Sequence, residues 1–217
     1  LDDLFAEPQD WSDILQDILS NNLFVLPVGA DGRWLRYHHL FRDFLRARLN
    51  AEQPGRVADI HIRLVYAYEQ RGEWERAYFT CRQFNDADLL AGLVERAGPT
   101  LLRRAVSTLA DWLNALPPAL SNSRPGLLSL RGGIGYLRGN YQEALTLLNE
   151  AERLYRESGD SAGLALALVR RATAHRNLGD YTASLRDSEE ALQLTQNDAN
   201  LLSVHAEAQR VKGLSLY

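Results

Sequence analysis

The 217-residue sequence contains no methionine, one cysteine (Cys81) and one lysine (Lys212). A single cysteine excludes an internal disulfide and a cysteine-rich metal site. No apolar run approaches the ~18 residues that a membrane-spanning helix needs, and no secretory signal opens the chain. We therefore expect a cytoplasmic protein without a membrane partner. Because position 1 is not methionine either, we expect the sequence to be a piece of a longer protein.

The sequence also lacks the short motifs of the common enzyme classes. A phosphate-binding loop needs Gly-Lys-Ser/Thr, and Lys212 is followed by Gly213. Neither the Gly-x-Ser-x-Gly turn of serine hydrolases nor a His-containing zinc motif is present. The net charge of -4 argues against general duplex-DNA binding, which depends on Lys and Arg. We expect no enzyme activity, no catalytic residue, no metal site and no direct DNA binding by this chain.

The sequence does contain an internal repeat. Residues 139–145 (Gly-Asn-Tyr-Gln-Glu-Ala-Leu) recur forty residues later as 179–185 (Gly-Asp-Tyr-Thr-Ala-Ser-Leu), and residues 72–77 are an earlier copy. We expect one degenerate copy over residues 87–117, between the copy at 72–77 and the copy at 139–145. Units of this length that stack as helix pairs bury a continuous core and form a concave surface that usually binds a ligand or partner.

The repeat register predicts where helices approach one another closely. Seven residues before the glycines of the two later copies stand Gly132 and Ala172, and Ala144 and Ala151 follow the first of these glycines. Small side chains at matched positions are typical of close helix packing. We expect these four residues to be buried.

The first fifty residues follow a different pattern. Apolar residues at helical spacing predict a helix over 10–19. A β-hairpin is predicted from the apolar residues 23–28, the turn residues 29–32 and residues 33–37. A second amphipathic helix is predicted over residues 38–49. Helix, hairpin and helix in this order predict a winged-helix domain.

The same register predicts which side chains face the concave groove. Five polar residues of the first helices are expected there, and they are Ser129, Tyr136, Thr173, Arg176 and Arg210. Hydroxyl, phenol and guanidinium groups suit a polar or anionic ligand, because guanidinium binds carboxylate and phosphate in bidentate fashion. The alternative is a solvated groove without a dedicated ligand.

Several segments resemble one protein family. Residues 21–27 (Asn-Asn-Leu-Phe-Val-Leu-Pro) and 34–49 (Trp-Leu-Arg-Tyr-His-His-Leu-Phe and onward) are similar to the winged helix of the large MalT-like regulators. These regulators belong to the STAND class of signal-transduction ATPases. Residues 112–117 and 124–127 resemble the start of their tetratricopeptide-like (TPR-like) sensor region. The resemblance covers essentially the whole chain.

The resemblance implies partners and one functional residue. In this family an ATPase domain precedes the winged helix, and a LuxR-type DNA-binding domain usually follows the repeats. The piece itself would then hold no cofactor, and ATP or ADP would bind elsewhere in the parent protein. In related nucleotide switches, a histidine at the start of the last helix of the winged-helix domain contacts the ADP β-phosphate. The resemblance implies that His38 makes this contact, with His39 as the alternative. The two histidines could instead only cap and pack the helix start.

We therefore expect a mainly α protein, with a winged-helix domain over 1–52, a helical linker with degenerate repeats over 53–123 and TPR-like repeats over 124–217. The expected function is the adaptor and inducer-sensing part of an ATP-dependent transcriptional activator. Its expected partners are an inducer or regulatory protein in the groove, the ATPase domain of the same parent chain, and further copies of the active full-length protein. The alternatives are a protein-binding scaffold, or a sensor that controls an enzymatic output domain.

Overall fold

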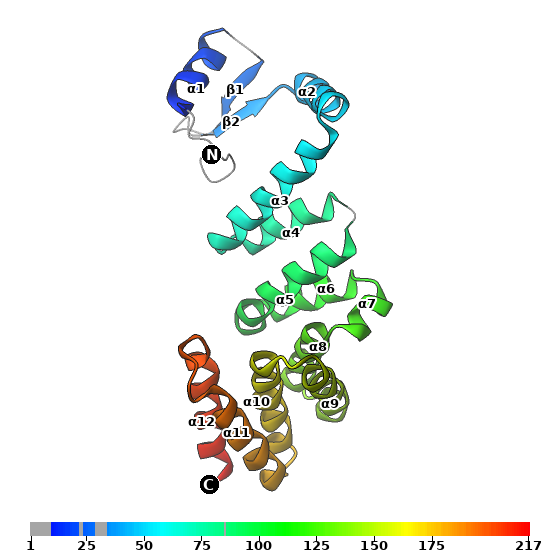
Figure 1. Ribbon diagram of the computed structural model, residues 1–217, viewed down its shortest axis with the longest axis vertical. Coiled ribbons are helices and arrows are strands. Elements are labelled where there is room, and N and C mark those ends of the chain that lie inside the picture. Colours follow the sequence, from blue (N-terminus) through cyan, green and yellow to red (C-terminus); the bar gives the residue numbers. More distant parts are fainter. Residues whose placement is uncertain (1–9, 22–23, 29–33, 85) are drawn as a thin grey trace. The chain divides into compact units, whose positions relative to one another are not determined.

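In the computed structural model of the chain, the described residues are 10–21, 24–28, 34–84 and 86–217. They divide into two compact units, residues 1–85 and 86–217, whose elements are labelled in Figure 1. The expected three-part division at 52/53 and 123/124 stays a prediction. Within the described ranges, no helix is both long and apolar enough to cross a membrane.

The first unit begins with the predicted helix and hairpin. Helix α1 (Trp11–Ser20) is capped by Asp10, whose carboxylate accepts backbone N–H bonds at its start. Strands β1 (Val25–Val28) and β2 (Trp34–Tyr37) pair antiparallel, with Val25 opposite Tyr37. Helix α2 (His39–Glu52) follows directly. The expected elements are therefore present, while the expected turn at 29–32 and the first residue of each predicted strand, Leu23 and Arg33, lie outside the described residues.

Aromatic contacts join the hairpin to α2. The ring of Phe41 lies 5.2 Å from that of Phe24, 5.9 Å from that of Tyr37 and 6.3 Å from that of Phe44, measured between centroids. Phe24 has a φ of 57°, which is rare for a bulky residue, and its carbonyl accepts the backbone N–H of His38 at 2.7 Å. This hydrogen bond and the ring contacts hold the start of α2 against the hairpin.

The rest of the first unit is a helix pair. Helix α3 (Pro54–Gln70) begins with proline at its first position, and α4 (Trp74–Arg82) packs against it. Gly72 joins them with a φ of 69°, in the left-handed region that favours glycine. The earliest copy of the repeat therefore forms a helical hairpin, as expected.

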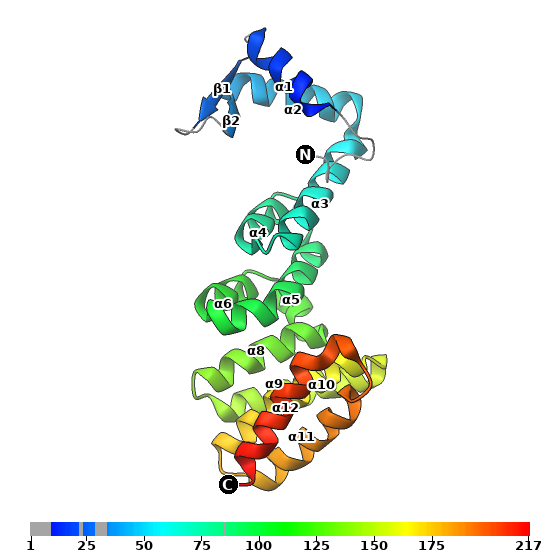
Figure 2. The ribbon, with the colours of Figure 1, turned by 90° about the vertical axis from the view of Figure 1, so that its left-hand side faces the viewer.

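The second unit is a stack of helices, which Figure 2 shows from the side. In chain order its helices are α5 (Ala87–Arg104), α6 (Val106–Asn114), α7 (Pro118–Ser123), α8 (Pro125–Leu137), α9 (Tyr141–Ser158), α10 (Ser161–Asn177), α11 (Tyr181–Thr195), the short 3₁₀ helix η2 (Ala199–Leu201) and α12 (Leu202–Ser215). Helix α8 pairs with α9, and α10 pairs with α11. The first helices of successive repeats also contact one another, α5 with α8, α8 with α10, and α10 with α12.

The small residues of the repeat lie where the register placed them. Ala144, Ala151 and Ala172 are fully buried. A Cβ atom added to Gly132 would lie 2.6 Å from Leu148 Cγ, so only glycine fits there. The expected mainly α fold, with a small hairpin and TPR-like repeats, is confirmed.

Candidate functional site

Arg170 is the most unusual polar residue of the second unit. It lies on α10 with 6% of its surface exposed, and its Nη1 atom donates to Ser129 Oγ on α8 at 2.6 Å. Among the residues that the structure describes, no carboxylate forms an ion pair with it. Burial lowers the pKa of Arg170, because removal from water disfavours the charged form. The site therefore contains a desolvated positive charge without a compensating negative one.

Two tyrosines lie beside this guanidinium. Burial raises the pKa of Tyr155 on α9 to about 12 and raises the pKa of Tyr136 on α8, while the positive charge of Arg170 opposes both shifts. Within the described chain, neither phenol hydroxyl has a hydrogen bond to protein. We call Ser129, Tyr136, Tyr155 and Arg170 the Arg170 site. It combines a guanidinium with two phenols that are free to donate.

Arg170 and Tyr155 line a pocket of about 380 Å³, together with other residues of α5, α8, α9 and α10. Three further charged residues at its wall already have partners. Arg124 Nη2 lies 2.6 Å from Glu95 Oε2. Asp160 accepts the backbone N–H of Gly163 at 2.8 Å and so caps α10. Arg170 is therefore the lining charge whose interactions with protein are least complete.

Helix α12 adds a second polar group on the same side. Arg210 is exposed and forms an ion pair with Glu207, with 2.6 Å between Nη2 and Oε1. The hydrogen bond from Arg210, assisted by the charge of Arg103, lowers the pKa of Glu207. Both charges of the α12 pair also influence Tyr136. The pKa of Tyr136 therefore depends on the charges of both the buried Arg170 and the exposed pair.

The next residue, Arg171, has the opposite environment. Its Nε and Nη2 atoms donate to the two oxygens of Asp187 on α11 at 2.6 and 3.0 Å, and that carboxylate is 1% exposed. Nη1 donates to Asn149 at 2.9 Å and also to Glu152 on α9. Burial disfavours the charged guanidinium, but these acceptors outweigh that effect and raise its pKa. Arg171 therefore links α9, α10 and α11 and is not available to a ligand.

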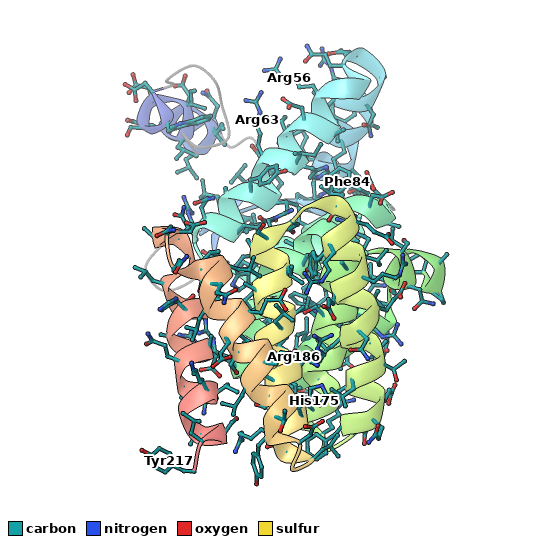
Figure 3. The ribbon with its side chains drawn as sticks, turned by 60° about the horizontal axis from the view of Figure 1, so that its bottom comes forward. Arg56, Arg63, Phe84, His175, Arg186 and Tyr217 are labelled. Atoms are coloured by element: carbon teal, nitrogen blue, oxygen red, sulfur yellow. The ribbon has the colours of Figure 1, made fainter. Side chains whose placement is uncertain are left out.

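The α10–α11 hairpin carries further charges around Asp187. Arg186 Nε lies 3.6 Å from Asp187 Oδ1, and His175 Nδ1 lies 3.7 Å from Asp180 Oδ2. Figure 3 labels Arg186 and His175 on this hairpin. These charges belong to the structural network rather than to the Arg170 site.

The five predicted groove residues differ in burial and in hydrogen-bond partners. Ser129 is fully buried under Arg170, Tyr136 is half-buried beside it, and Arg210 influences Tyr136. The Thr173 hydroxyl donates to the Val169 carbonyl of its own helix at 3.0 Å. Arg176 donates to Asn177 at 3.0 Å, and its buried Nε has no partner in the described structure. The structure thus groups Ser129, Tyr136 and Arg210, but not Thr173 or Arg176. A role for any of them in ligand binding stays a prediction.

Sequence reasoning missed Arg170 itself. It stands nine residues before Gly179, and Leu130 stands nine residues before Gly139 in the preceding repeat. The useful signal was therefore an arginine at a position where the other copy has a buried leucine.

His38 and His39 are exposed at the start of α2, with ring centroids 4.4 Å apart. His38 is the N-cap residue, but its side chain makes no capping hydrogen bond. Its predicted contact with a nucleotide phosphate stays a prediction. No group of three or more potential metal ligands occurs in the described part of the chain.

Comparisons with known proteins agree with this architecture. Residues 2–57 match the MalT winged helix domain family, and residues 125–198 match the tetratricopeptide repeat family. Over 192 residues the chain is 25% identical to the HTH-type transcriptional regulator MalT of Vibrio parahaemolyticus, which covers 88% of this chain. The MalT of Klebsiella pneumoniae is 28% identical over 205 residues, or 92% of the chain. The chain is therefore similar to MalT regulators over most of its length.

The similarity concerns only a part of those regulators. The chain spans 21% of the Vibrio protein and 23% of the Klebsiella protein. No solved structure gave a match. The MalT-like chain thus corresponds to a winged helix followed by TPR repeats, an arrangement consistent with the sensor region of a transcriptional regulator.

Proposed function

We propose that this MalT-like chain is the adaptor and inducer-sensing segment of an ATP-dependent transcriptional activator of the STAND class. The observation that carries the proposal is the Arg170 site on α8, α9 and α10 of the TPR repeats, in a chain that is similar to a transcriptional regulator over most of its length. Repeat arrays usually bind partners on the concave surface of their stacked helices, and ligand pockets combine an apolar lining with a few polar groups. The parent protein would act in the cytoplasm.

The mechanism is a shift between two populations. ADP held in part by His38 favours a closed resting form, and inducer in the repeats favours an open, ATP-bound form that self-associates and presents a LuxR-type DNA-binding domain. An inducer shifts this equilibrium only by its difference in affinity for the two forms. The winged helix acts as the adaptor that connects the ATPase domain to the repeats.

The test uses transcription from the parent regulator's own promoter in a reporter strain, over a panel of growth substrates. Replacing Arg210 or Arg176 with methionine should reduce the response to the inducing substrate and leave the binding of ATP by the parent protein unchanged. The matched control is Arg153→Met, at an exposed arginine of α9 that is paired with Glu150 on its own helix. An undiminished response in both groove variants would refute the sensing role.

A second candidate is binding of a regulatory protein, which the tetratricopeptide match favours. A protein partner would cover several first helices, whereas a small inducer would occupy only the pocket. Hydrogen exchange of the parent protein under inducing conditions separates the two, because protection that extends from α8 through α12 requires a partner of macromolecular size.

A further inference from the structure

The inference starts from the charge balance of the Arg170 site and rests on the proposed function. A buried guanidinium is normally paired with a carboxylate, because removal from water is costly unless its hydrogen bonds are replaced. Arg170 is 6% exposed and has a serine hydroxyl as its only hydrogen-bond partner in the described structure. Arg171, which is 7% exposed on the same helix, has two carboxylates and an amide. The unpaired charge is therefore particular to Arg170.

Two donors of the Arg170 site lie at the same pocket. Arg170 and Tyr155 both line it, and the Tyr155 hydroxyl has no hydrogen bond to the described protein. A guanidinium with uncommitted N–H groups presents a fork that matches the two oxygens of a carboxylate or a phosphate. The volume of about 380 Å³ admits a small metabolite anion.

We propose that the Arg170 site binds the carboxylate or phosphate group of a small anionic ligand, with Arg170 as the charged donor and Tyr155 as a neutral one. The nearest competing charges do not fill this role, because Glu95 pairs with Arg124 and Asp160 caps α10. Such an anion would supply the negative charge that the fold omits. Binding would also tie α8, α9 and α10 together, the helices that carry the site.

The experiment is calorimetric titration of the 217-residue protein with inorganic phosphate and, separately, with succinate, at an ionic strength held constant with sodium chloride. We expect saturable binding of at least one anion, with a Kd of about 1 mM or below. The anion that binds distinguishes phosphate recognition from carboxylate recognition. Arg170→Met should abolish binding, and Tyr155→Phe should weaken it roughly tenfold through loss of one donor to a charged ligand.

Two further variants make the result specific. Arg170→Lys keeps the charge but loses the fork, so it should bind at least ~10-fold more weakly than the wild type. Arg153→Met removes an exposed, ion-paired arginine of α9 and should bind like the wild type. Circular dichroism establishes that each variant has the helix content of the wild type.

Absence of saturable binding for both anions, or binding that survives Arg170→Met, overturns the proposal. The proposed sensing function fails differently. If the purified protein binds an anion through Arg170 but the reporter response of the parent regulator is unaffected by Arg170→Met, the site stands and the sensing role falls. If neither anion binds while the Arg210 variant still blunts the reporter, the sensing role stands and the anion site falls.

Discussion

Arg170 and Arg171 are consecutive on α10, yet Arg171 forms a bidentate pair with the buried Asp187 while Arg170 donates only to the hydroxyl of Ser129. Successive residues of a helix point about 100° apart, so one guanidinium reaches α11 and the other reaches α8. The first stabilises the stack of helices. Arg170 carries a buried positive charge that no carboxylate of the described structure pairs with.

Replacement by methionine should therefore change the free energy of unfolding very differently at the two arginines. Arg171→Met leaves Asp187 buried without its bidentate partner and should lower the free energy of unfolding by about 3–5 kcal/mol. Arg170→Met removes an unpaired buried charge, so its effect should lie within about 1 kcal/mol of the wild type or be stabilising. Urea denaturation followed by circular dichroism measures both. Equal losses in the two variants would contradict this difference in pairing.

The close approach of α8 and α9 should make Ala144 intolerant of enlargement. Ala144 is fully buried, and a Cβ atom added to Gly135 would lie 3.1 Å from Ala144 Cβ. Ala144→Leu should overpack this contact and lower the free energy of unfolding by about 1–3 kcal/mol. Ala206→Leu, at an exposed position of α12, is the control and should change little. An unchanged midpoint for Ala144→Leu would show that the repeat register is wrong.

Because Gly163 has no side chain, the ring of Tyr155 can pack against the start of α10. A Cβ atom added to Gly163 would lie 2.1 Å from Tyr155 Cε1, so alanine must displace the ring. Gly163→Ala should destabilise the protein by about 1–3 kcal/mol and weaken anion binding at the Arg170 site. Gly213, in α12, has nothing within 4 Å of an added Cβ. Gly213→Ala should therefore stabilise the protein by about 0.5–1 kcal/mol, measured in the same denaturation assay.

The raised pKa of Tyr155 predicts a loss of stability in alkali. An unfolded tyrosine ionises near pH 10, whereas burial raises the pKa of Tyr155 to about 12 in the folded protein. Between pH 10 and pH 12 the unfolded state binds fewer protons than the folded state. The free energy of unfolding therefore falls as the pH rises, by up to ~1.4 kcal/mol per pH unit. The contribution of Tyr155 to the free energy of unfolding is fully present below pH 10 and decreases above it. Tyr155→Phe should show a shallower decline from pH 10 to 12 in urea titrations; parallel curves would contradict the assignment.

The exposed histidines of α2 allow a test of the resting state in the parent regulator. Loss of a phosphate contact worth ~1–2 kcal/mol would shift a two-state equilibrium roughly tenfold toward the active form. His38→Ala should therefore release ADP faster and activate the reporter without inducer. His39→Ala is the matched control on the adjacent exposed residue. If only His39→Ala has these effects, the contact belongs to His39; if neither does, the pair has no nucleotide role.

The elements of this chain followed from local patterns, whereas the contacts between its helices did not. Gly72, Gly139 and Gly179 all have positive φ, as expected of residues that end the first helix of a repeat. The same patterns did not determine the contacts of the predicted groove residues. Thr173 shares the register of a groove position, yet its hydroxyl bonds to its own helix. A periodicity of 3.6 residues places a side chain on a face but does not determine which acceptor the side chain reaches.

The sequence by itself determined the helix pairs, the hairpin, the repeat register and the similarity to MalT-like regulators, because apolar periodicity, small residues and turn glycines act within a few residues of one another. Only the tertiary structure decided which arginine is paired. Ser129 lies 41 residues before Arg170, and Asp187 lies 16 residues after Arg171. Those acceptors come from neighbouring helices of the stack, and the energy of a buried charge depends on partners that packing places beside it rather than on the residues that precede and follow it.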